Sequence, residues 1–266
     1  EEGSVSSLYY ASRVQELTLG LFSIGLSIAL LPTFSEQAFR RDIQGMKKTL
    51  VFSFKFILFI TLPAMVGLLI LHRPIIQVLL ERGLFSGLST AMTSQCLFYF
   101  AFGLPFISGV KILAPAFYSF KDIKTPVTVA FFVMITYIGL SLILMNPLRV
   151  SGIALALSLA SVLNFAALFI LLERKIGRIQ KKEIVLSAVK SAFSAAVMGL
   201  AVWFFMGQFD FPGMIFLEKL AVLSAAIGLG IMVYVVLSLV VSHEDLRSLK
   251  DVFSRKRDST ESGDKL

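Results

Sequence analysis

The stretch LVFSFKFILFITLPAMVGLLIL, residues 50–71, contains Lys55 as its one charged side chain. A helix needs about 20 predominantly apolar residues to cross the hydrocarbon core of a bilayer, so this stretch is long enough to span. Segments of about ten residues with alternating hydrophobicity, which would indicate a membrane β-barrel, are absent from the sequence. The stretch therefore predicts an all-α protein, a polytopic bundle of transmembrane helices.

The rest of the chain supports this class. Hydrophobic residues make up 56% of the 266 residues and charged residues 16%, and the mean hydropathy is +0.83, which excludes an ordinary soluble domain. A further segment, residues 74–81, is too short to cross, so we expect it to lie at the interface or to extend the second span. We predict seven spans, at residues 5–34, 50–71, 91–117, 126–145, 150–172, 184–206 and 214–241.

The distribution of Lys and Arg predicts the orientation of these spans. Seventeen of the 25 Lys and Arg residues fall in the loops and tail on one side, and four fall on the other. Cytoplasmic loops are enriched in basic residues, so the chain start is expected outside and its C-terminus in the cytoplasm. This topology explains the net charge of +8 without a nucleic-acid partner, and we predict none.

Arg13 and Glu16 form an opposite-charge pair placed well inside a predicted span. Residues three apart share a helix face, and Ser6 belongs to the same face about two turns earlier. An arginine inside a bilayer costs about 2.5–3.5 kcal/mol on insertion scales, so it persists where it faces a partner or a watery cavity. The pair indicates either a substrate-binding cavity or an interior ion pair that only fixes helix packing.

Residues that break helices mark possible hinges. Pro63 falls in the middle of the second predicted span, and Gly103 and Pro105 fall in the third. Each proline removes a backbone hydrogen bond and favours a kink, which is either a static bend or a hinge.

The sequence offers no chemistry of the usual catalytic kinds. It has no phosphate-binding loop, nucleophile elbow or dinucleotide-binding loop. His72, His243 and Cys96 are far apart in the sequence, so we predict no metal and no cofactor. Cys96 is the single cysteine, so we also predict no disulfide within the chain. These features favour transport over catalysis.

Four motifs resemble a known family: GSVSSLYYASRVQEL at residues 3–17, LLPTFSE at 30–36, ERGLFS at 81–86 and KILAPAFYSFKDIKTPV at 111–127. Together they are similar to the MurJ (MviN) lipid II flippases of the multidrug, oligosaccharidyl-lipid and polysaccharide exporter superfamily. The resemblance implies fourteen helices, two six-helix lobes around a cavity and two extra helices. The chain begins with Glu1 and Glu2, without a methionine, and we expect it to be the later part of such a protein.

The resemblance implies that residues 1–174 line the cavity and that residues 175–242 form a lipid-tail groove. The residue pattern of the remaining part, 243–266, predicts a cytoplasmic tail that is amphipathic at first and then disordered. The expected partners are lipid II, which is undecaprenyl diphosphate carrying the peptidoglycan disaccharide-pentapeptide, the membrane lipids, and the N-terminal lobe of the same protein. The chain would flip lipid II across the bacterial inner membrane by alternating access and would be inactive without the first lobe.

The resemblance also implies roles for single residues. Arg13 would match the cavity arginine of this helix, Glu16 the acid one turn later, and Ser6 the small polar residue above them. Ser12 departs from relatives that carry an acid immediately before the arginine. The alternatives are an exporter of another polyprenyl-linked glycan or of a drug, and a non-transporting membrane scaffold of cell-wall synthesis.

Overall fold

The computed structural model describes residues 4–82, 85 and 87–241 of the chain, and the described elements are all helices. The predicted all-α class is confirmed. The elements are α1 (Ser4–Leu19), a π-helix (Gly20–Ile24), α2 (Gly25–Phe39), α3 (Ile43–Leu80), α4 (Gly87–Ser119), α5 (Lys124–Leu148), α6 (Val150–Ile176), α7 (Lys181–Met206), a 3-10 turn (Phe211–Gly213) and α8 (Phe216–Val241).

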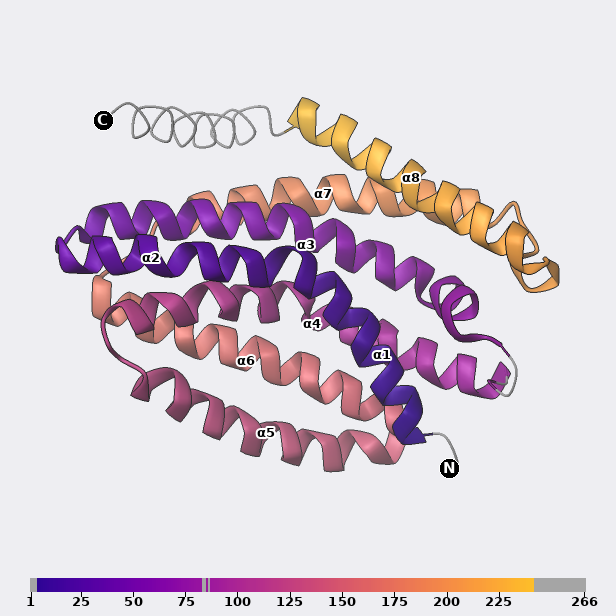
Figure 1. Cartoon of the computed structure of the whole chain (residues 1–266), viewed down its shortest axis with the longest axis horizontal. Coiled ribbons are helices and arrows are strands. Elements are labelled where there is room, and N and C mark those ends of the chain that lie inside the picture. Colours follow the sequence, from indigo (N-terminus) through magenta and orange to yellow (C-terminus); the bar gives the residue numbers. More distant parts are fainter. Residues whose placement is uncertain (1–3, 83–84, 86, 242–266) are drawn as a thin grey trace, which may run out of the picture.

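Six of the helices, α3 to α8, are long and apolar enough to cross a membrane by length and composition. They correspond to six of the seven predicted spans. The remaining predicted span, residues 5–34, is divided by the π-helix into α1 of 16 residues and α2 of 15 residues. The chain nevertheless stays helical from Ser4 to Phe39, and α1 and α2 follow one another along one side of the bundle (Figure 1).

The second predicted span is longer than expected. Helix α3 has 38 residues and runs through Pro63 and Pro74 to Leu80, so residues 74–81 extend this span and do not form a separate interfacial helix. At its start, Asp42 accepts a hydrogen bond from the backbone N–H of Gly45 at 2.8 Å, which caps the first turn. Figure 1 shows α3 changing direction near its middle, where Pro63 interrupts the backbone ladder.

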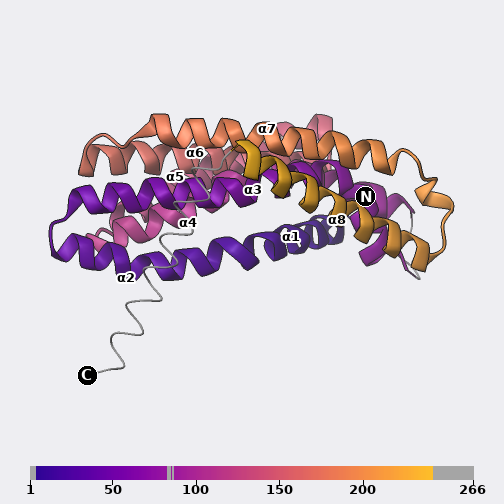
Figure 2. The same ribbon diagram turned by 90° about the horizontal axis from the view of Figure 1, so that it is seen from above.

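Helix α4 lies at the centre of the bundle, whereas α5 is peripheral. In the most apolar 18-residue window of each helix, 61% of α4 is buried but only 6% of α5. One core cluster joins α2, α3, α4 and α6 around Phe34, Phe54 and Phe117. A second joins α1, α3, α4 and α6 around Leu97 and Phe100. Seen from above, α1 and α2 form one outer layer of the molecule (Figure 2).

The last two helices attach to the bundle mainly through α3. A third apolar cluster contains Leu71 and Val78 of α3, Val202 of α7 and Leu223 of α8. The hydroxyl of Tyr234 in α8 donates a hydrogen bond to the backbone carbonyl of Phe59 at 2.7 Å. That these two helices are additions to a lobe, and that they form a lipid-tail groove, stays a prediction.

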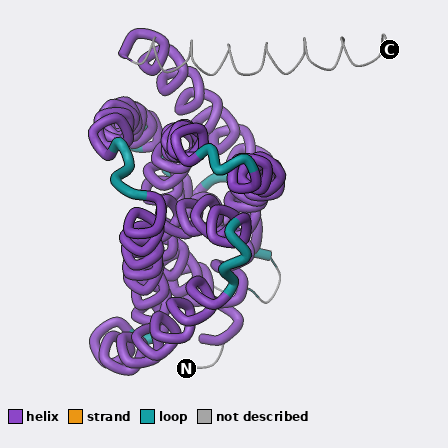
Figure 3. The backbone as a smooth tube through the Cα atoms, turned by 90° about the vertical axis from the view of Figure 1, so that its left-hand side faces the viewer, coloured by secondary structure: helices purple, strands orange, loops and turns teal. Residues whose placement is uncertain are grey.

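Charged side chains pair at the end of the bundle that carries the α2–α3, α4–α5 and α6–α7 loops, which faces the viewer in Figure 3. The ion pairs there are Arg40–Glu36 (2.8 Å), Lys55–Glu183 (3.0 Å), Lys175–Asp122 (2.6 Å) and Lys181–Glu173 (2.6 Å). This is the end predicted to be cytoplasmic. The predicted tail, residues 243–266, lies outside the described residues.

Candidate functional site

Helix α1 has one face turned into the bundle and one face turned away from it. Ser7, Ala11, Gln15 and Leu19 follow each other at every fourth position and are all buried. The side-chain amide of Gln15 donates a hydrogen bond to the backbone carbonyl of Phe100 in α4 at 2.9 Å. Positions four apart share a face of a helix, so this stripe fixes α1 against α4.

Arg13 and Glu16 stand on the opposite face. The Nη1 atom of Arg13 lies 2.7 Å from Oε2 of Glu16, and the side chains are 56% and 58% exposed. The guanidinium carbon of Arg13 also lies 4.8 Å from the centre of the Tyr9 ring, within the range of a cation–π contact. The structure therefore brings the predicted pair together and leaves both charged groups accessible to a ligand.

Ser6 is exposed on α1 as well, but the structure does not bring it into the ion pair. No hydrogen bond among the described residues joins Ser6 to Arg13 or Glu16. Ser12, which stands where some relatives are expected to have an acid, donates its hydroxyl hydrogen to the backbone carbonyl of Tyr9 at 2.8 Å. The Ser12 hydroxyl therefore bonds within α1 and adds no charge beside Arg13.

Lys111 is a further cation that interacts with this ion pair. It is half-buried in α4, and the carboxylate of Glu16 acts on its ammonium group electrostatically. The two residues are distant in the sequence, so only the packing of α1 on α4 brings them near each other. Beside the Arg13–Glu16 pair, the candidate site therefore has a second cation, Lys111, within the electrostatic reach of Glu16.

The proposed hinge residues of α4 lie where α4 and α6 approach closely. A methyl group added at Gly103 would lie 2.9 Å from Oγ and 3.2 Å from Cα of Ser158. The Ser158 hydroxyl donates to the backbone carbonyl of Tyr99 at 2.7 Å, and Pro105 is buried inside α4. Close helix packing thus explains the glycine directly, while a hinge function of Gly103, Pro105 and Pro63 stays a prediction.

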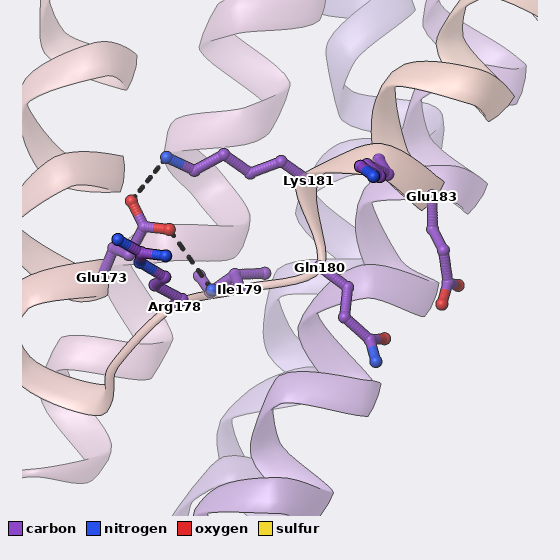
Figure 4. A pocket seen from close by; sticks show the side chains of 7 residues that line it. Glu173, Arg178, Ile179, Gln180, Lys181 and Glu183 are labelled. Carbon is purple, nitrogen blue, oxygen red and sulfur yellow. Dashed lines mark hydrogen bonds and ion pairs between the residues drawn. The ribbon is translucent and has the colours of Figure 1, made fainter.

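A second charged site lies at the α6–α7 turn, where an open cavity of about 700 Å³ is lined by Arg178, Lys182 and Glu183 among others. Figure 4 shows its main contacts. One oxygen of Glu173 pairs with Lys181, and the other accepts a hydrogen bond from the backbone N–H of Ile179 at 3.3 Å. Both oxygens of the Glu173 carboxylate thus bind groups of the α6–α7 turn, so we assign this cluster a structural role in stabilising the turn.

The sequence matches the family model described as "Lipid II flippase MurJ" over residues 1–241. The protein of Rhizobium tropici named "Probable lipid II flippase MurJ" is 31% identical over 97% of this chain and 49% of its own length. The protein of the same name from Vibrio cholerae is 30% identical over 93% of this chain and 48% of its own length.

A solved structure described as "Lipid II flippase MurJ, inward closed conformation" has a similar fold. The TM-score is 0.73 at 29% sequence identity, and the match covers 92% of this chain and 48% of the other. The chain therefore spans about half the length of the curated relatives that it matches.

Proposed function

The chain belongs to the MurJ family of lipid II flippases, and on that premise we propose that it forms the second half of a flippase for lipid II. The complete protein moves undecaprenyl diphosphate carrying the peptidoglycan disaccharide-pentapeptide from the inner to the outer leaflet of the bacterial cytoplasmic membrane. It is a multi-pass transporter and not an enzyme, because translocation breaks no covalent bond. The chain start faces the outside and the C-terminus the cytoplasm.

The observation that carries the proposal is the exposed Arg13–Glu16 pair on the face of α1 opposite its packing stripe. Arginine presents a planar fork of donors that matches phosphate oxygens and stays charged at every physiological pH. A guanidinium in a cavity away from bulk water binds a diphosphate with charge-assisted hydrogen bonds. Arg13 is thus the residue expected to hold the substrate headgroup.

Glu16 and Lys111 regulate the charge of this site. When no substrate is present, Glu16 neutralises Arg13 at 2.7 Å. An arriving diphosphate competes with Glu16 for the guanidinium, and Lys111 remains near the carboxylate that has been displaced. The exchange lets the site keep a paired charge both with and without substrate, which lowers the cost of a charged group within the membrane. Ser6 adds a hydroxyl for the headgroup at the outer end of the same face.

Alternating access needs a second lobe opposite α1, which we propose is the N-terminal half of the complete protein. Residues 1–174 then line the central cavity and residues 175–242 form the groove for the prenyl tail. Pro63, Gly103 and Pro105 are the positions at which α3 and α4 bend as the cavity changes sides. Residues 1–241 alone lack the facing lobe and are expected to be inactive.

The test is complementation in a bacterium depleted of its own lipid II flippase, with the complete protein carrying Arg13→Ala. The fraction of lipid II that an impermeant amine-reactive reagent labels from outside is measured beside the membrane level of the protein. We expect R13A to reduce labelling by at least about tenfold at a normal membrane level. Arg73→Ala, which removes an exposed arginine outside the site, is the matched control.

Two other outcomes would assign the protein differently. If R13A removes the protein from the membrane, the ion pair is a packing device and the scaffold interpretation holds. If the unaltered protein fails to complement but exports another polyprenyl-linked glycan, the substrate assignment is wrong while the transporter class stands.

A further inference from the structure

The end of the bundle opposite the α6–α7 turn contains a cavity that the proposed transport path does not use. It has a volume of about 480 Å³ and lies where α3 and α4 meet the turn between α5 and α6. A second cavity of about 210 Å³ continues from it along α4 towards Leu88. Both are lined by Gln95, Leu148, Arg149 and Ser151, so the two form one elongated site.

Arg149 is the single residue between α5 and α6, and its backbone is strained. Its φ is 51° and its ψ is −132°, a region that glycine adopts freely and residues with side chains avoid. The turn is also tight, because a methyl group at Gly152 would collide with the backbone carbonyl of Leu144. Glycine would fit the backbone at position 149 better, so the arginine side chain contributes something that the turn itself does not require.

The lining changes from polar to apolar along the site. The exposed side chains of Arg149 and Gln95 belong to both cavities. The larger cavity continues to Phe98, Tyr99 and Pro147 and reaches His72. The His72 ring is held in place by a 2.9 Å hydrogen bond to the backbone carbonyl of Leu69 and by edge contact with Phe98. Among the residues that the structure describes, the lining contains no carboxylate.

The surface around the site is suited to lipid. Leu142 and Ile143 of α5 and Leu88 of α4 are all more than 60% exposed. Helix α5 is apolar and hardly buried, as expected of a helix that faces acyl chains. A ligand reaching the site from this surface has to combine an anionic group with an apolar chain.

We propose that this site binds a phospholipid with one net negative charge, of the phosphatidylglycerol type. The phosphodiester lies against the guanidinium of Arg149 and the amide of Gln95, and the first part of an acyl chain covers Phe98 and Tyr99. The absence of a carboxylate among the described lining residues favours an anionic over a zwitterionic headgroup. The site is separate from Arg13 and Glu16, and the proposal does not depend on the identity of the transported lipid.

The test measures binding of dioleoyl phosphatidylglycerol to the complete purified protein by native mass spectrometry, with melting temperature recorded in the same detergent. Arg149→Gly is expected to weaken binding by at least about tenfold. Because glycine relieves the backbone strain, R149G is also expected to melt at the same or a higher temperature without lipid. Arg73→Ala, on the exposed surface of α3 and outside the lining, is the control that should leave binding unchanged.

Several results would overturn the proposal. A lower melting temperature for R149G would mean that loss of binding by this variant can follow from damage to the turn. In that case Gln95→Leu, an exposed position that leaves the turn intact, has to weaken binding for a lipid site to survive. Equal binding of dioleoyl phosphatidylcholine, displacement by millimolar inorganic phosphate, or displacement by lipid II would each contradict an anionic phospholipid site.

Discussion

Gln15 and Phe100 join α1 to α4 through a buried hydrogen bond, in which the side-chain amide donates to the backbone carbonyl at 2.9 Å. Gln15 is only 4% exposed. It is two residues from Arg13 in α1, where successive side chains differ in direction by about 100°. The bond that anchors the inner face therefore determines where the guanidinium on the outer face points.

Replacing Gln15 by leucine keeps the size of the side chain and removes the donor. The backbone carbonyl of Phe100 then loses its side-chain partner, and we expect a loss of about 1–3 kcal/mol in the free energy of unfolding. Transport should fall as well, because Arg13 loses its fixed direction. Thermal unfolding in detergent measures the first effect and external lipid II labelling the second. Thr18→Val, which removes a hydroxyl bonded within α1, should change stability by no more than about 0.5 kcal/mol.

Replacing Glu16 by glutamine tests the exchange between carboxylate and diphosphate. The variant keeps the shape of the side chain but no longer neutralises Arg13. We expect lipid II to bind up to about fivefold more tightly, since an exposed ion pair contributes modestly, and to be transported more slowly because release is delayed. Equilibrium binding and the transport assay on one preparation separate the two effects. Unchanged affinity together with slower transport would argue against competition at Arg13.

The Asp122–Lys175 pair predicts an acid-dependent loss of stability. A hydrogen bond from Lys175 and further bonds from Thr125 lower the pKa of Asp122 from 3.8 to about 2. The folded state thus holds the carboxylate more strongly in its charged form. Its stabilisation is complete above about pH 4 and disappears as the pH falls towards 2. Asp122→Asn should cost about 1–2 kcal/mol at pH 7, and its melting temperature should converge with that of the unaltered protein near pH 2.

Replacing Gly103 by alanine distinguishes packing from hinge motion. The added methyl group meets Ser158 at 2.9–3.2 Å, so we expect a loss of about 1–3 kcal/mol from overpacking between α4 and α6. Removing the hydroxyl by Ser158→Gly in the G103A background should recover part of that loss. If G103A leaves the melting temperature unchanged and abolishes transport, the glycine acts as a hinge.

The long apolar stretches were enough to predict the class and the positions of α3 to α8, because the bilayer imposes length and composition on every span. The proximity of Arg13 and Glu16 could be predicted equally well from the sequence, since two charges three residues apart on one helix must be neighbours. The relation of Lys111 to Glu16 could not be predicted, because it depends on how α1 packs on α4. Gln15 shares a four-residue spacing with Ala11 and Leu19, which indicates one helix face, but this spacing does not show which group on another helix the amide would bond.

The cavity at Arg149 was beyond prediction for two physical reasons. Its lining comes from α3, α4 and the α5–α6 turn, which are far apart along the chain. The distinctive property of Arg149 is a positive φ, and the sequence shows only an arginine in a short loop. The sequence pattern therefore places Arg149 only among the basic residues on one side of the membrane.

The π-helix at Gly20–Ile24 sets the phase between α1 and α2. Its i to i+5 bonding widens one turn by a residue, and its Ser23 hydroxyl shares a hydrogen bond with Ser108 at 2.8 Å. Because the wide turn holds one residue more than an α-helical turn, excising a residue there returns it to α geometry and leaves the phase of α1 nearly unchanged, whereas the same excision within α2 would turn α1 by about 100°. A single-codon deletion within α2 would therefore carry the outward arginine around the helix axis by more than a quarter of a revolution and misdirect the charge, while a deletion within the wide turn would not.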